Sequence, residues 1–382
     1  MKKLVTLAGC AALCAAFVLP SIADDSLVTI GGHMKGPVLT DNVWGDYMVN
    51  GVKGSGGYSA GTYFSGHAFI LYASKDISDN VSVHAYPGFD NSGAGATPTL
   101  GKALGANLKT TSGSITPSLH ELTVNYNLPD AGVHLRAGYM STYFTMDYGH
   151  ELFWGEEFNG GNYTLRGGSW HDSGLEAYKA FEFGNYSLPT YLYILNGNGS
   201  DARDNNNSRA VMLHVEPQFG PVKVFGSYGT GYWGDAVASS SGTLIGSSEA
   251  GQKNKSFYRW TFGAEYAYKR FTVRGEMGAN KYDGQLANGN ANAYNHGMYL
   301  KGFYTILPEK LTAMVHYDNY VDNATNGAGT KVEKFDTTYV GLNYDMAPSA
   351  TLMLGYTYGN WRDNVRDYVK FHRIETAVRV TF

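Results

Sequence analysis

Apolar and polar residues alternate with a period of two along most of the chain. Over residues 258–266, aromatic residues and alanine alternate with Arg, Thr, Gly and Glu, and residues 374–382 alternate in the same way. This period gives a β-strand one apolar and one polar face. No segment shows a helical pattern of three turns. The sequence therefore predicts an all-β protein.

The alternating segments predict sixteen strands, most of them about 9–11 residues long, which is enough for a tilted strand to cross a bilayer. The strands are predicted at residues 26–34, 65–75, 81–89, 117–127, 133–142, 172–181, 188–196, 209–216, 221–228, 257–267, 271–279, 294–305, 311–319, 335–345, 350–359 and 370–382.

The predicted connections alternate between short turns and long loops. The short turns are residues 76–80, 128–132, 182–187, 217–220, 268–270, 306–310 and 346–349. The long loops lie near residues 35–64, 90–116, 143–171, 197–208, 229–256, 280–293, 320–334 and 360–369. Such alternation with an even strand number is typical of a transmembrane β-barrel. A sheet in lipid must close on itself to pair its backbone groups, and sixteen strands enclose a water-filled lumen.

Composition agrees with a barrel and excludes other classes. Charged residues make up 16% of the chain, against roughly 25% in soluble proteins. The mean hydropathy of −0.27 does not fit a helical membrane protein. Nucleic-acid binding is not expected, since the net charge is −4 and no basic block occurs. The 30 tyrosines are predicted at the water–lipid interface, as where Tyr356 and Tyr358 follow Leu352 and Leu354.

Residues 1–23 have the pattern of a secretory signal peptide, which leaves residues 24–382 as the barrel. Lys2 and Lys3 precede an apolar stretch that ends at a small-residue cleavage site. A lipoprotein cleavage site at Cys10 is the alternative, with a very short apolar core. Both cysteines, Cys10 and Cys14, lie inside this segment, so the remainder can form no disulfide, thiolate metal site or haem-attachment motif.

Two further features carry a resemblance to a known family. The chain ends in an alternating strand with a terminal Phe382, and residues 135–139 lead the fifth strand into a long third loop, residues 141–171. With the sixteen strands, these features resemble the porins of Gram-negative outer membranes. The resemblance implies a barrel whose third loop folds inward to constrict the lumen, with Phe382 read by the barrel-assembly machinery. It also implies an outer-membrane location surrounded by lipid, and a homotrimer.

Charged side chains predicted to face the lumen are the candidate functional residues, because opposed charges in a narrow pore orient solutes and set ion selectivity. The predicted constriction consists of Asp147, Glu151, Glu156 and Glu157. The predicted basic pore wall consists of Arg136, Lys223, Arg259, Arg274, Arg373 and Arg379, together with Lys301. Acidic residues predicted to face inward are Glu121, Glu176, Glu216, Glu265, Glu276 and Glu375. The alternative is that neighbouring pairs only stiffen the wall.

The predicted function is passive diffusion of ions and small hydrophilic solutes, with no catalytic, metal or cofactor site. A glycine-rich motif at residues 229–234 resembles a dinucleotide-binding loop but lacks the helix that this site requires. Neither a sugar-specific nor a phosphate-specific pattern is evident, so the solute stays open. A sheath around an electron-transferring cytochrome is the main alternative. A barrel enzyme is a further one, although the sequence shows no serine–histidine arrangement for it.

Overall fold

The computed structural model contains almost exclusively β-strands. It describes residues 29–35, 42–49, 52–58, 68–90, 116–146, 169–184, 186–197, 208–233, 255–282, 293–322, 325–326, 329–330, 333–362 and 366–381. The predicted signal peptide lies outside these residues. Within them, no helix has the length and apolar character needed to span a membrane. The short 3-10 helix Pro129–Ala131 forms the turn after β6.

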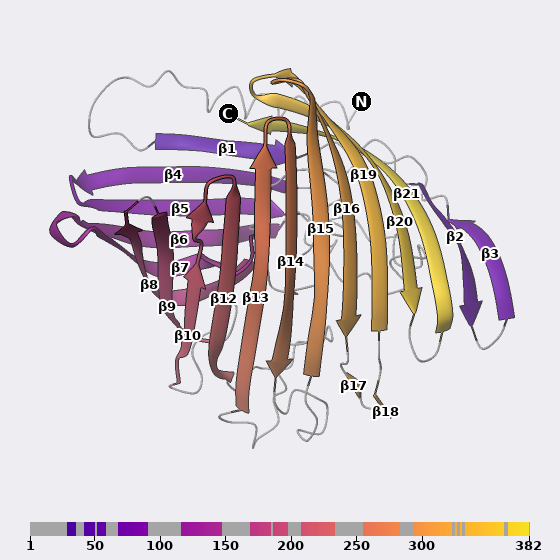
Figure 1. Ribbon diagram of the computed structural model, residues 1–382, viewed down its shortest axis with the longest axis horizontal. Coiled ribbons are helices and arrows are strands. Elements are labelled where there is room, and N and C mark those ends of the chain that lie inside the picture. Colours follow the sequence, from indigo (N-terminus) through magenta and orange to yellow (C-terminus); the bar gives the residue numbers. More distant parts are fainter. Residues whose placement is uncertain are drawn as a thin grey trace.

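Sixteen antiparallel strands form one nearly closed barrel (Figure 1). They are β1 (Thr29–Lys35), β4 (Ala68–Ser78), β5 (Val81–Asp90), β6 (Thr116–Leu128), β7 (Val133–Tyr143), β8 (Ser169–Phe183), β9 (Tyr186–Leu195), β10 (Ala210–Val215), β12 (Val222–Trp233), β13 (Lys255–Tyr268), β14 (Phe271–Tyr282), β15 (Ala293–Leu307), β16 (Leu311–Asp322), β19 (Glu333–Ala347), β20 (Ala350–Arg362) and β21 (Arg366–Thr381). Each overlaps one of the sixteen predicted strands, so the predicted fold class is confirmed.

The first strand meets the last over part of its length, which leaves the barrel nearly closed. β1 pairs with β4 on one side and with β21 on the other, over His33–Lys35. Further along β21, the partner is β2 (Asn42–Val49), which forms a hairpin with β3 (Val52–Tyr58). The prediction of one long loop over residues 35–64 is therefore wrong, because part of that segment continues the sheet beside β21.

Short turns follow alternate strands, as predicted. Gly132, Gly184 and Gly220 adopt left-handed backbone angles in three of them, which glycine does without steric cost. The connection expected over residues 360–369 is shorter than predicted, since β20 continues to Arg362 and β21 begins at Arg366. Small pairings also occur in the connections, at β11 (Gln218–Phe219) and between β17 (Thr325–Asn326) and β18 (Gly329–Thr330).

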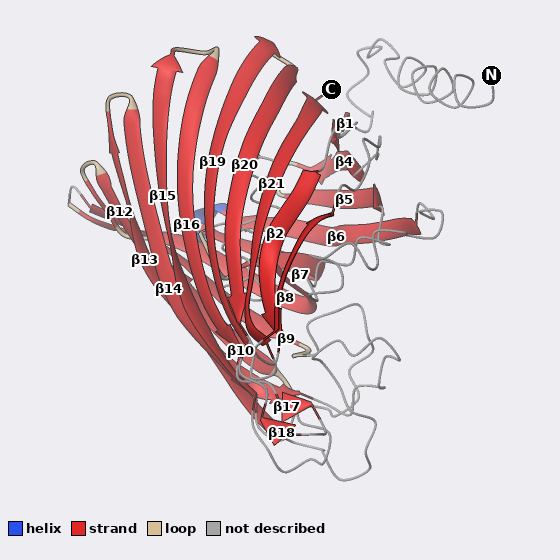
Figure 2. Cartoon of the chain, turned by 90° about the vertical axis from the view of Figure 1, so that its right-hand side faces the viewer, coloured by secondary structure: helices blue, strands red, loops and turns tan. Residues whose placement is uncertain are grey.

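The two faces of the wall differ in the way that the alternation predicts. On β10, Val211 and Leu213 are each 45% exposed, whereas Met212 and His214 between and beyond them are fully buried. On β20, Leu354 and Tyr356 are exposed on the outside. Figure 2 shows the strands curving around a common interior. The outer face is therefore an apolar belt suited to lipid, and the inner face carries the charged and polar side chains.

Candidate functional site

Arg136 on β7 is the centre of a charged cluster on the inner face. Its guanidinium donates to the carboxylate of Glu176 on β8 at 2.6 Å and to that of Glu121 on β6 at 3.4 Å. It also donates to the carbonyl of Ser141 at 2.8 Å, near the end of β7. One cation between two carboxylates removes their mutual repulsion. The cluster therefore joins three neighbouring strands and fixes the start of the third loop.

A second charged group extends from Glu216, which follows β10, to Arg274 on β14, with charges of alternating sign. Lys223 donates to the Glu216 carboxylate at 2.7 Å, and Nε of Arg274 donates to Glu265 at 2.8 Å. Glu265 on β13 is directly opposite both Lys223 on β12 and Arg274 on β14. Opposite charges at facing positions stabilise a sheet, and here they also give the inner face paired donors and acceptors.

The residues that follow β7 leave the wall and lie against the inner face of strands farther along the barrel. The Phe144 carbonyl accepts hydrogen bonds from the hydroxyls of Ser227 on β12 at 2.6 Å and Thr261 on β13 at 3.0 Å. The backbone N–H of Met146 donates to Glu276 on β14 at 3.3 Å. Because β8, β9 and β10 separate β7 from β12 in the sheet, the chain passes over their inner side. Its course beyond residue 146 lies outside the described residues.

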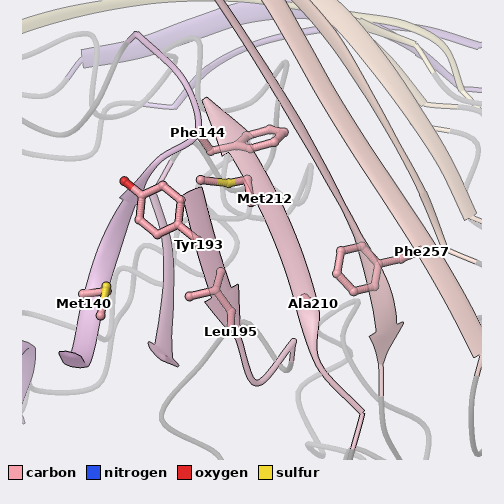
Figure 3. Close-up of a cluster of buried hydrophobic side chains, with 7 residues drawn as sticks. All are labelled: Met140, Phe144, Tyr193, Leu195, Ala210, Met212 and Phe257. Atoms are coloured by element: carbon pink, nitrogen blue, oxygen red, sulfur yellow. The ribbon is translucent and has the colours of Figure 1, made fainter. Parts of the chain in front are cut away.

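The Phe144 side chain completes this attachment. The Arg259 guanidinium lies 4.5 Å from the centroid of the Phe144 ring, a cation–π contact, and Arg259 Nε donates to Asn280 at 3.1 Å. The ring also belongs to a buried apolar cluster on the inner face (Figure 3). The cluster consists of Met140, Phe144, Tyr193, Leu195, Ala210, Met212 and Phe257. Apolar packing thus holds the start of the third loop in addition to its hydrogen bonds.

The structure places the predicted wall residues as follows. Arg136, Lys223, Arg259 and Arg274 take part in the contacts above. Arg379 donates to the hydroxyl of Thr351 at 3.1 Å. Lys301 is buried, with Nζ 4.9 Å from the Tyr299 ring centroid. Three sets of side chains lie outside the described part: Arg373, Glu375, and the predicted constriction of Asp147, Glu151, Glu156 and Glu157.

Sequence reasoning missed the tyrosines of the inner face. Tyr191 and Tyr193 alternate on β9 with Leu192 and Ile194, which are exposed on the outer face. The assignment of the tyrosines to the water–lipid interface is therefore wrong for these two. The alternation itself was the available signal, because the outward leucine and isoleucine place both tyrosines on the opposite face.

Two further arrangements concern chemistry other than conduction. Across β7 and β8, the hydroxyl of Ser141 and Nε2 of His171 are 2.5 Å apart, a serine–histidine contact that the sequence did not reveal. Among the residues that the structure describes, no three His, Cys, Asp or Glu side chains gather closely enough to hold a metal ion.

Comparisons with known proteins identify the fold. No family model and no curated protein matches the chain. Among solved structures, the trimer form of OmpT, an outer membrane protein of Vibrio cholerae, aligns with a TM-score of 0.54 at 14% identity, over 94% of this chain and 100% of that one. The anion-selective porin of Comamonas acidovorans aligns with a TM-score of 0.54 at 12% identity, over 94% of this chain and 100% of that one. The outer membrane channel DcaP of Acinetobacter baumannii aligns with a TM-score of 0.57 at 11% identity, over 93% of this chain and 97% of that one. The chain thus has the porin fold.

Proposed function

We propose that this protein is an outer-membrane porin, which forms a water-filled channel for passive diffusion of ions and small hydrophilic solutes. The observation that carries the proposal is the pairing of an apolar outer belt with a charged inner face on one sixteen-stranded barrel. A barrel of this size is wide enough to hold water beside its inward side chains. The proposal assigns no catalytic role and no cofactor.

The chain is proposed to lose residues 1–23 on export and to assemble as a homotrimer. The trimer form of the Vibrio OmpT structure supports the oligomeric state, since that structure has the same fold. The terminal Phe382 is proposed as the contact for the barrel-assembly machinery. Cross-linking of the purified protein in detergent, followed by native mass measurement, tests the trimer. A mass of one chain under all conditions would contradict it.

Conduction is tested by incorporating the purified protein into a planar lipid bilayer under a KCl gradient. We expect discrete current steps, grouped in threes if the trimer inserts as a unit. The reversal potential gives the sign of ion selectivity. A folded barrel without conductance would contradict the proposal, and haem absorbance in that preparation would favour the cytochrome sheath instead.

The acidic residues of the third loop are proposed to favour cations at the constriction. Replacing Glu151, Glu156 and Glu157 together with glutamine should move the reversal potential toward anion preference, because the loop then attracts cations less strongly. Glu309→Gln in a short turn is the control and should leave the potential unchanged. An unchanged potential in the triple variant would mean that selectivity is set elsewhere on the wall.

The attachment of the third loop at Phe144 is proposed to set the size of the open channel. Replacing Ser227 with alanine and Thr261 with valine removes both hydroxyl donors to the Phe144 carbonyl. We expect noisier single-channel currents and a changed step size, while the barrel stays folded. Ser187→Ala, near the start of β9 and away from the third loop, is the control. If the double variant conducts like the parent, the other contacts of residues 144–146 suffice to fix the loop.

A further inference from the structure

A row of four aromatic side chains crosses the inner face of four consecutive strands. His134 on β7 is directly opposite Tyr178 on β8, Tyr178 is opposite Tyr191 on β9, and Tyr191 is opposite His214 on β10. The distances between successive ring centroids are 5.7, 4.6 and 5.6 Å. Each ring therefore lies beside the next, tilted by 45°, 37° and 56° in turn, and the four form a series of neighbouring rings, here called the aromatic row.

The aromatic row leads to the attachment point of the third loop. The next position after His214 in the same register is Ser227, whose hydroxyl lies 2.6 Å from His214 Nδ1 and donates to the Phe144 carbonyl. Tyr143, just before Phe144, lies 4.9 Å from the Tyr191 ring. Strands of a barrel are tilted, so a row perpendicular to them climbs obliquely along the pore axis. A solute that follows the row is thus guided toward the loop.

His134, Tyr178 and Tyr191 keep part of their surface accessible, whereas His214 at the end of the row is fully buried. Tyr143, which packs beside the row, is also only partly buried, in contrast to Tyr193, two residues beyond Tyr191 on β9, which is fully buried. Aromatic side chains that serve only as core have both faces covered, whereas half-covered rings on a lumen wall offer a flat apolar surface. The row therefore provides a stacking surface as well as packing.

Paired charges border the row on both sides. Arg136 with Glu176 lies on the side of β7 and β8, and Lys223 with Glu216 lies beyond His214, whose Nε2 is 3.0 Å from Glu216. Each group contributes both hydrogen-bond donors and acceptors. A ligand with an apolar face and hydroxyl groups along its edge matches this arrangement, since it can stack on the rings and bond to either charge. An anionic aromatic solute would meet the carboxylates of Glu176 and Glu216.

We infer that the aromatic row is a binding site for sugar rings in transit, centred on Tyr178 and Tyr191. The inference rests on the proposed channel function and specifies a class of solute for it. Weak binding along the wall raises the residence of neutral sugars near the third loop and so favours their passage over that of linear solutes of equal size.

The test measures block of the KCl current by maltotriose in a planar bilayer. We expect a saturable decrease in ion conductance. Tyr191→Leu and Tyr178→Leu should each raise the maltotriose concentration for half-maximal block about five- to tenfold, because leucine keeps apolar bulk without the stacking face. Tyr191→Phe should retain block, since the ring remains. Tyr228→Ala, on the outer face of β12, is the matched control, and maltotriose should block this variant as strongly as the parent.

Two results would overturn the inference while the channel function stands. One is a conducting channel with no saturable block by maltotriose, or with block unaffected by both leucine variants. The other is stronger block by benzoate than by maltotriose, which would assign the row to aromatic solutes. If the protein does not conduct, the channel proposal fails. Titration calorimetry of maltotriose with the detergent-solubilised barrel then tests separately whether the aromatic row binds sugar. Heat of binding that the Tyr191→Leu variant abolishes supports it, and absence of heat in the parent overturns it.

Discussion

Replacing either Gly138 or Gly174 with alanine is expected to destabilise the barrel strongly. These two glycines are directly opposite each other on β7 and β8. A Cβ atom at Gly138 would lie 2.2 Å from the Leu122 carbonyl oxygen, and one at Gly174 would lie 2.2 Å from the Ile194 carbonyl oxygen. Both obstructions are backbone atoms of a neighbouring strand, so no side-chain rotation relieves them.

Gly138 carries a second constraint, since its φ of +134° is a conformation that residues with a side chain rarely adopt. Overpacking and backbone strain together predict a loss of about 3 kcal/mol for Gly138→Ala. The measurement is urea unfolding of the barrel in lipid vesicles, with the folded fraction also read from heat-dependent migration in gels. In the same assay, Gly174→Ala should lower the free energy of unfolding somewhat less, because only the overpacking applies there.

Gly302→Ala on β15 is the matched control for both variants. It is also a glycine-to-alanine change within a strand, but nothing lies within 4 Å of the added carbon. It should change stability by less than about 1 kcal/mol, and in the favourable direction if the lower entropy of the unfolded chain dominates. Parent-like stability in Gly138→Ala would mean that β6 and β7 can separate there without cost.

Replacing Arg136 with methionine should destabilise the barrel by a similar amount. The side chains of Arg136, Glu121 and Glu176 are only 16%, 8% and 9% exposed. Removing the cation leaves two neighbouring carboxylates with no charge partner from β7 and also releases the Ser141 carbonyl. Loss of one member of a buried charge group costs about 3 kcal/mol. We expect this loss in urea unfolding, together with a changed conductance because the start of the third loop is no longer fixed.

Lys223→Met provides the comparison, because it also removes one cation from an ion pair on the inner wall. Lys223 is 31% exposed, so water already screens its pair with Glu216, and the expected loss is under about 1 kcal/mol. The two variants should therefore differ clearly in stability. Equal losses would show that water reaches the Arg136 cluster as easily as it reaches Lys223. If Arg136→Met does not fold, Arg136→Lys, which keeps the charge, should restore the barrel.

The sequence by itself determined the number and positions of the sixteen strands and the face on which most of their side chains lie. The reason is local, since a strand between lipid and water must alternate, and each strand shows this alternation independently of its neighbours. Inward positions such as Arg136, Arg259 and Arg274 follow from the same parity. The hairpin of β2 and β3 was missed because glycines at positions 45, 51, 54, 56 and 57 leave little alternation to read.

Only the tertiary structure decided which inward side chains meet. Tyr178, Tyr191 and His214 belong to different strands, and their contact depends on the register between strands, which pairing and barrel closure set together. The attachment of Phe144 to Ser227 and Thr261 joins positions 83 and 117 residues apart in the chain, across three and four intervening barrel strands. The alternation of apolar and polar residues along one strand does not reveal these contacts. They arise when the curved wall brings distant residues around one interior.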